Sequence, residues 1–77
     1  MKELLELIAR GLVDQPDAVV VEQDEPTDDG LVVLHLHVAE GDMGRVIGKQ
    51  GRIAKAMRTV MRAAATRQDV RVSVEID

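Results

Sequence analysis

One short stretch of the chain combines two glycines with basic residues at a spacing that suits the binding of anions. It reads Val46-Ile47-Gly48-Lys49-Gln50-Gly51-Arg52-Ile53. Gly48 and Gly51 tolerate backbone angles that a side chain would penalise, and they let a partner approach the main chain closely. The amide groups that follow would open a helix, whose unpaired N–H groups favour anions. With Lys49 at its tip, the stretch predicts a cradle for phosphate groups.

The positive charges of the chain concentrate around this stretch. The 77 residues carry a net charge of −4. Residues 1–42 have a net charge of −9, whereas residues 43–67 contain seven cations and no acid. Residues 68–77 have a net charge of −2. A phosphate backbone would therefore meet a local positive patch, and the acidic remainder would limit indiscriminate binding.

Residue types that are missing from the chain exclude several kinds of function. Without Phe, Tyr or Trp, the protein cannot stack bases as RRM, cold-shock and OB-fold surfaces do. Without cysteine, it has no thiolate nucleophile and no cysteine-ligated metal. Ser73 is the only serine, and it has no recognisable base partner. We therefore expect a binding protein, not an enzyme, and no cofactor.

Two further patterns resemble ligand sites only superficially. His35 and His37 lie two apart on one strand face, but two ligands do not make a metal site, even if Glu22 or Glu75 comes near. Residues 44–50 differ from the phosphate-binding loop of nucleotide hydrolases: three residues instead of four separate the glycines, and a glutamine replaces the required Ser or Thr. We expect a polar outer sheet face at the histidines, and neither metal binding nor nucleotide hydrolysis.

Hydrophobic periodicity predicts the elements that position the glycine stretch. Apolar residues at helical spacing predict helices, and alternating apolar and polar residues predict strands. The expected elements are a helix at Met1–Asp14, strands at Ala18–Asp24 and Leu31–Ala39, a short helix that ends at Ile47, a helix at Arg52–Arg67 and a strand at Val70–Ile76. Asp42 is expected to cap the short helix. The long helix is expected to bury an arc made of Ile53, Met57, Val60, Met61 and Ala64.

The element order α-β-β-α-α-β predicts one α+β domain. The first two strands should form an antiparallel hairpin, and a right-handed crossover through the helix pair makes the second and third strands parallel. We expect a three-stranded mixed sheet with the helices packed on one face. The acidic turn Glu25–Gly30 joins the first two strands, and the sequence does not fix its place relative to the glycine stretch.

The segment Met43–Ala65, MGRVIGKQGRIAKAMRTVMRAAA, resembles the core of the small bacterial KH proteins of the KhpA family. A lone Gly-x-x-Gly would mean little, since Gly41-Asp-Met-Gly44 has that spacing too. The full Val-Ile-Gly-x-x-Gly-x-Ile pattern inside a basic segment carries the resemblance. It implies a single type II-like KH domain over residues 1–77, with its GxxG loop at residues 48–51. In a KH domain, about four nucleotides of single-stranded RNA lie in a groove beside this loop.

The resemblance also implies which residues would bind RNA. They are Arg45, Val46, Ile47, Gly48, Lys49, Gln50, Gly51, Arg52, Ile53 and Lys55. The cations would neutralise phosphates, the glycines would hold the backbone, and the apolar residues would form a floor for bases. Membership of this family would make the protein a bacterial RNA chaperone or post-transcriptional regulator. Its partner would be a second copy of itself or the larger KH-containing protein KhpB.

A second function stays open, in which the KH scaffold serves chiefly as a protein-interaction module for homo- or heterodimerisation. Arg58, Arg62 and Arg67 would be either a solvated helix face or an extended surface for RNA or a partner. Without aromatic platforms, RNA binding would be weak and have little sequence preference. No apolar run approaches the roughly 20 residues of a membrane span, and the first residues lack a signal-peptide core, so we expect a cytoplasmic protein.

Overall fold

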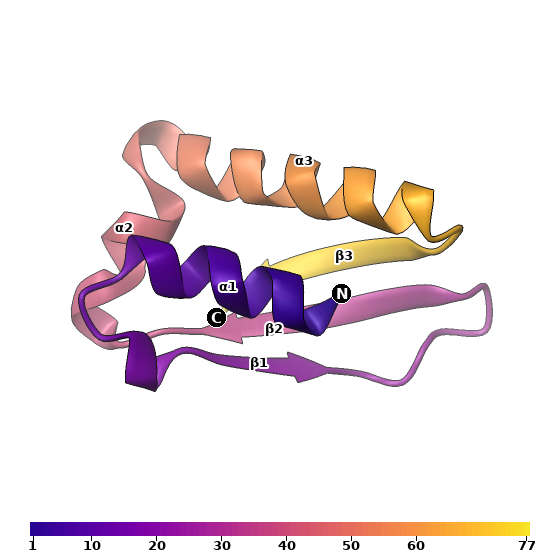
Figure 1. Ribbon diagram of the computed structural model, residues 1–77, viewed down its shortest axis with the longest axis horizontal. Coiled ribbons are helices and arrows are strands. Elements are labelled where there is room, and N and C mark those ends of the chain that lie inside the picture. Colours follow the sequence, from indigo (N-terminus) through magenta and orange to yellow (C-terminus); the bar gives the residue numbers. More distant parts are fainter.

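The computed structural model describes all residues 1–77 and has the predicted element order (Figure 1). The helices and strands are α1 (Lys2–Leu12), β1 (Val20–Gln23), β2 (Leu31–His37), α2 (Met43–Ile47), α3 (Arg52–Arg67) and β3 (Arg71–Ile76). Short 3₁₀ turns occupy Pro16–Ala18, Glu40–Asp42 and Lys49–Gly51. The bounds of α3 are those expected from the sequence. None of the helices is both long and apolar enough to cross a membrane.

The three strands form the mixed sheet that the element order predicts. β1 pairs antiparallel with β2, and β2 pairs parallel with β3, so β2 is central. Two helices cover one face: α1 packs against β1 and α3, and α3 packs against β3 (Figure 1). The fold is therefore α+β, with the helices on one side of a three-stranded sheet.

The hydrophobic core lies between this sheet and the helices. Its buried members come from every helix and strand: Leu5, Ala9, Val19, Val21, Leu34, Leu36, Val46, Met57, Met61, Ala65, Val72 and Val74. Alternation along β2 sends Leu34 and Leu36 into the core and His35 to the opposite face, as the sequence pattern predicts.

The buried face of α3 differs from the predicted arc. Val60 is 47% exposed, and Ala64 is only partly buried, whereas Ala54 and Ala65 are buried together with Met57. The buried stripe passes through alanines because a small side chain lets the helix approach the sheet closely. Helical spacing of the apolar residues correctly predicted the burial of Met57 and Met61 but wrongly placed Val60 inside.

Several predicted helix and strand boundaries were too generous. α1 ends at Leu12, and β1 begins only after a 3₁₀ turn that Pro16 opens, since a proline suits a first helical position. β2 ends at His37 because the chain turns into the next 3₁₀ segment. Val70 is outside β3, and its N–H donates to the carbonyl of Ala65, which closes the end of α3.

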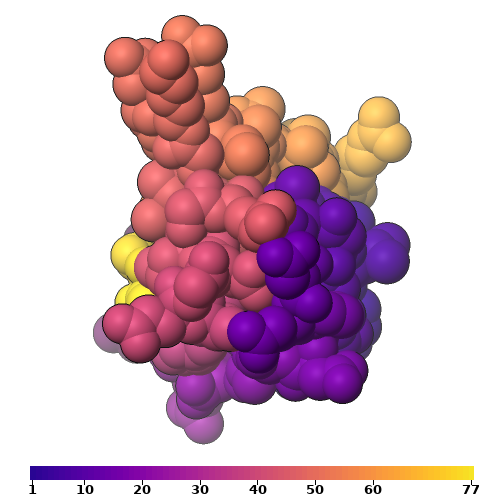
Figure 2. Space-filling model, turned by 90° about the vertical axis from the view of Figure 1, so that its left-hand side faces the viewer, coloured from indigo at the N-terminus to yellow at the C-terminus, as the bar shows by residue number.

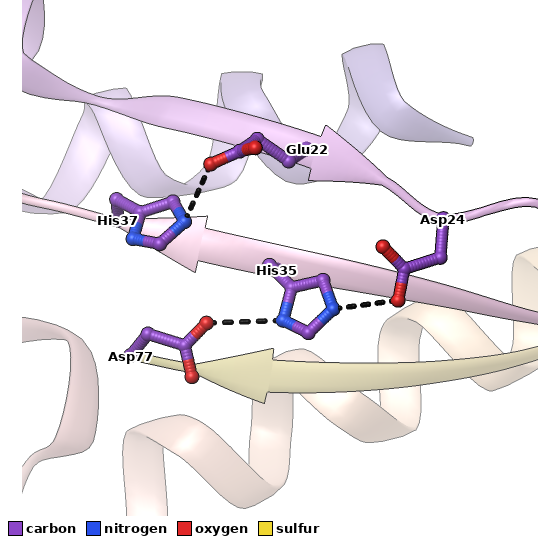
Figure 3. Close-up of polar contacts among 5 residues, drawn as sticks. All are labelled: Glu22, Asp24, His35, His37 and Asp77. Carbon is purple, nitrogen blue, oxygen red and sulfur yellow. Dashed lines mark hydrogen bonds and ion pairs between the residues drawn. The ribbon is translucent and has the colours of Figure 1, made fainter.

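The histidines on the outer face of the sheet contact carboxylates (Figure 3). His35 lies between two of them, with Nε2 2.8 Å from Asp24 and Nδ1 3.0 Å from Asp77. His37 Nε2 lies 2.9 Å from Glu22. No group of three or more histidines and acids has an arrangement that would hold a metal ion. These contacts connect all three strands across the face that the helices leave open.

The molecule is elongated, and this shape separates its acidic turn from its glycine loop. The longest axis measures 35 Å. The glycine loop lies at one end of this axis, and the β1–β2 turn lies at the other (Figure 1). The acidic residues of that turn therefore do not adjoin the glycine loop, which settles a question that the sequence left open.

Candidate nucleic-acid interface

The glycine loop is a tight turn between α2 and α3 built from residues with positive φ. Gly48 ends α2 with φ 75° and ψ 175°, and its N–H donates to the carbonyl of Gly44 at 2.8 Å. Gln50 has φ 58°, and Gly51 stands before α3 with φ 74° and ψ 15°. Figure 2 shows the segment around residue 50, in coral, projecting from the body of the molecule. The loop is thus accessible from outside.

The two glycines of the loop are required for different reasons. A Cβ atom at Gly48 would lie 2.6 Å from Cγ1 of Ile53, and the backbone angles there are essentially restricted to glycine. A Cβ atom at Gly51 would meet nothing within 4 Å, so only the left-handed backbone favours glycine there. Gly48 fits against the start of α3, whereas Gly51 leaves main chain uncovered toward solvent.

The cations around the loop fall into two groups. Lys49, Arg52 and Lys55 are exposed and form no ion pair within the protein. Arg45, which the sequence grouped with them, is instead paired: its Nη2 lies 2.8 Å from Asp14. The exposed cations on the α3 side of the loop are therefore free for an external anion, whereas the guanidinium of Arg45 connects α2 to the end of α1.

The apolar residues of the predicted site differ in how far they are buried. Val46 is fully buried and belongs to the core, so it supports the loop from beneath and offers no surface to a base. Ile47 is 37% exposed, and Ile53 is partly buried against the core. Only these two isoleucines present apolar surface beside the glycines.

Asp42 stands at the N-terminal end of α2 but does not cap it, contrary to the sequence-based expectation. The preceding 3₁₀ turn already provides an acceptor for the first N–H group of the helix. The carboxylate of Asp42 instead accepts the N–H groups of Asp14 and Gln15 at 3.2 and 3.1 Å, and contacts Arg45 Nε at 3.4 Å. Asp42 thus joins the chain after α1 to the helix that carries the glycine loop.

A polar groove of about 270 Å³ lies between α3 and the edge strand β3. It is lined by Arg58, Arg62, Val72, Ser73, Val74 and Glu75. The Nε–H group of Arg58 donates to the carbonyl oxygen of Val74 at 3.2 Å. Of the three arginines whose role the sequence left open, Arg58 and Arg62 line this groove and Arg67 does not. No pattern in the sequence around Arg58 predicted its hydrogen bond to a main-chain atom of β3.

A second groove, also of about 270 Å³, is entirely apolar and lies between α1 and α3. Its lining residues are Ile8, Leu12, Ile53, Ala56, Met57 and Val60. A shallow apolar surface continues from Val60 along α3 to Arg67. The two grooves lie on different sides of α3, so the helix separates a polar surface from an apolar one.

Comparison with known proteins identifies relatives over the full length of the chain. The family model described as "KhpA/KhpB, KH domain" matches residues 2–76. The RNA-binding protein KhpA of Clostridium acetobutylicum is 59% identical over 76 residues, which cover 99% of both chains. The protein of the same name from Chlamydia trachomatis is 43% identical over 99% of this chain and 95% of its own.

Solved structures of the protein Era share the fold. The structure of Aquifex aeolicus Era bound to GDP and AlF₄⁻ superimposes with a TM-score of 0.66 at 22% identity. A second structure, of Era in complex with MgGDPNP and nucleotides 1506–1542 of 16S ribosomal RNA, gives a TM-score of 0.67 at the same identity. Each match covers 97% of this chain but only 28% of Era. The likeness therefore concerns the fold of this domain alone.

Proposed function

The chain belongs to the KhpA/KhpB family of KH domains, and from this membership we propose that it binds single-stranded RNA through the glycine loop, residues 48–51. One observation carries the proposal: the loop projects with uncovered main chain, and the exposed cations beside it have no acidic partner. Relatives of similar length are named RNA-binding proteins. The proposed role is non-catalytic.

In the proposed complex, the sugar–phosphate backbone of the RNA crosses the glycine loop. Lys49, Arg52 and Lys55 neutralise phosphates, and the uncovered main chain at Gly51 lets the backbone approach. Ile47 and Ile53 provide apolar contact, and Gln50 at the tip offers a hydrogen-bonding group without charge. Arg45 acts indirectly, because its ion pairs with Asp14 and Asp42 fix α2 in place.

Because no aromatic side chain is present to stack on bases, a single copy gains its affinity mainly from phosphate contacts, and binding depends strongly on salt. Weak binding of many RNAs is the behaviour expected of an RNA chaperone or a post-transcriptional regulator. We propose this cellular role on that ground.

The proposal is tested by reversing the charge of the loop tip with Lys49→Asp plus Gln50→Asp. Gly48 and Gly51 remain in place, and Asp tolerates the positive φ of residue 50. The matched control is Lys2→Asp plus Gln23→Asp, which makes the same charge change at exposed positions outside the loop. Fluorescence anisotropy with a labelled single-stranded RNA is measured at about 50 and about 200 mM salt. Circular dichroism verifies that each variant is folded.

We expect the loop variant to bind RNA about tenfold more weakly or worse at low salt, whereas the control stays close to the unmodified protein. Equal losses in both variants would mean that net charge, and not the loop, determines binding. A loop variant that binds as well as the unmodified protein would disprove the site. Absence of RNA binding by the unmodified protein at low salt would disprove the function.

A second candidate function, dimerisation, is favoured by the apolar groove between α1 and α3. Val60, which lines it, is 47% exposed, and Leu7 on α1 is 69% exposed, although both are large apolar side chains. We propose a second copy of the chain as the occupant. In a two-fold related pair the same surface of each copy forms the contact, so the exposed apolar groove of one copy would lie against that of the other.

The dimer is tested by sedimentation equilibrium of the unmodified protein and of Val60→Asp, which places a charge in the apolar groove. We expect the unmodified protein to associate and the variant to be monomeric. A monomeric unmodified protein would disprove self-association. If it associates only when KhpB is added, the partner is the larger relative, whose KH domain belongs to the same family.

A further inference from the structure

We propose that Arg58 recognises guanine in the groove between α3 and β3 and so gives the RNA site a base preference. This inference rests on the proposed binding of RNA at the glycine loop. Arg58 is six residues beyond Arg52, or about 9 Å along the helix axis. A KH domain contacts about four nucleotides, so an RNA held at the loop extends over this groove.

The guanidinium group of Arg58 is fixed in one orientation by the protein. Its Nε–H donates to the carbonyl of Val74 at 3.2 Å, and the side chain is partly buried. No acidic side chain pairs with it, and its two terminal amino groups make no hydrogen bond within the protein. A fixed guanidinium with two free amino groups matches two adjacent acceptors on a ligand. Among the bases, guanine presents such a pair at O6 and N7.

The edge of β3 adds main-chain donors and acceptors to the same groove. The N–H of Asp77 donates to Leu36 on β2, so odd-numbered residues of β3 direct their main-chain groups toward β2. By the alternation of a parallel ladder, Val72 and Val74 direct theirs away from β2, toward the groove. Val74 accepts from Arg58, which leaves its N–H group free as a donor.

The two free amino groups of Arg58 are donors only, which favours a base that presents acceptor atoms to them. Adenine and cytosine present an amino group where guanine and uracil present a carbonyl. The amino group of adenine or cytosine would therefore face the amino groups of Arg58, and two donors cannot form a hydrogen bond with each other. Glu75, which lines the same groove, provides a carboxylate that can accept the N1–H and N2–H groups of guanine. Among the bases, only guanine combines two adjacent acceptors, O6 and N7, for Arg58 with two adjacent donors, N1–H and N2–H, for Glu75.

The inference is tested with three labelled RNA octamers that differ only in their purines. They are UUGUUGUU, UUAUUAUU and a UUGUUGUU in which 7-deazaguanine replaces guanine and removes the N7 acceptor. Anisotropy is measured for the unmodified protein, Arg58→Gln, Arg58→Lys and the control Arg67→Gln. Arg58→Lys keeps the charge but lacks the planar guanidinium, whereas Arg67→Gln removes one charge from α3 outside the groove.

We expect the unmodified protein and Arg67→Gln to prefer the guanine octamer over the adenine octamer by about fivefold or more, and 7-deazaguanine to lower this preference. Both Arg58 variants should bind the two octamers equally. Equal binding or an adenine preference in the unmodified protein would overturn the inference, as would a preference that survives in Arg58→Lys. Each of these results leaves RNA binding itself intact, whereas failure to bind any octamer would overturn the proposed function.

Discussion

Two surfaces of the protein differ in whether their basic residues have acidic partners. One is the outer face of the sheet, and the other runs from the glycine loop along α3. On the outer face, His35, His37 and Arg71 all lie within ion-pair distance of carboxylates. Along the other surface, Lys49, Arg52 and Lys55 have no acidic partner. Pairs within the protein hold strands together, whereas solvated cations remain available to an external anion. The net charge of −4 describes neither surface.

Changing Gly48 should have the largest effect, because it acts on the loop that presents the free cations. We expect Gly48→Ala to lower the free energy of unfolding by about 3 kcal/mol, from backbone strain together with the contact of the new Cβ atom with Ile53. Gly51→Ala, with open space around its Cβ atom, should cost about 1 kcal/mol. Urea titration followed by circular dichroism measures both, since the chain has no tryptophan or tyrosine for fluorescence. Equal effects of the two variants would contradict the different roles of the two glycines.

Removing the carboxylate of Asp42 should have the next largest effect. Its side chain is 3% exposed and accepts the main-chain N–H groups of Asp14 and Gln15. Asp42→Ala leaves both donors without their partner, and we expect a loss of about 2 kcal/mol of stability. Asp42→Asn keeps one acceptor oxygen and should lose less. If Asp42→Ala were as stable as the unmodified protein in the same urea titration, the connection between α1 and α2 would not depend on this residue.

A comparison of Arg45 with Lys49 tests directly whether pairing withholds a cation from RNA. Lys49→Gln should lower the salt dependence of RNA binding by about 0.7 in the slope of log K against log salt, the value for one phosphate contact on a single strand. Arg45→Gln should leave this slope unchanged and lower stability instead, because its guanidinium contacts Asp14 and Asp42. Equal changes of slope in the two variants would show that Arg45 leaves its ion pairs when RNA binds.

The features of the fold that depend on local sequence patterns were predicted correctly. Alternation and helical periodicity gave the element order and the strand pairing, and the glycines with their flanking residues gave the full extent of α3. Asp14, which accepts a hydrogen bond from Arg45, lies 31 residues away in the chain, and the acceptor of Arg58 is a main-chain oxygen on another element. The burial of Val46 likewise depends on how α2 sits against the core. These facts follow from packing between distant segments, which no local pattern encodes.

The smallest predicted effect concerns His35, on the face where charges are paired. Both of its ring nitrogens face carboxylate oxygens, and carboxylates only accept hydrogen bonds, so this geometry requires a doubly protonated ring. The hydrogen bond to Asp24, and then that to Asp77, raises the pKa of His35 above its ordinary value. Its other titratable neighbours are His37 with Glu22 on the same face, and Glu75 beside it in register on β3.

A raised folded-state pKa means that His35 contributes stability in full below its unfolded pKa, and that the contribution disappears as the pH rises through the folded value. The stability difference between the unmodified protein and His35→Gln should therefore be larger at about pH 5.5 than at about pH 8.5. His37→Gln, which removes a histidine that contacts one carboxylate, controls for loss of the ring. A difference for His35→Gln that stays constant between the two pH values would show that its contacts with Asp24 and Asp77 do not depend on its charge.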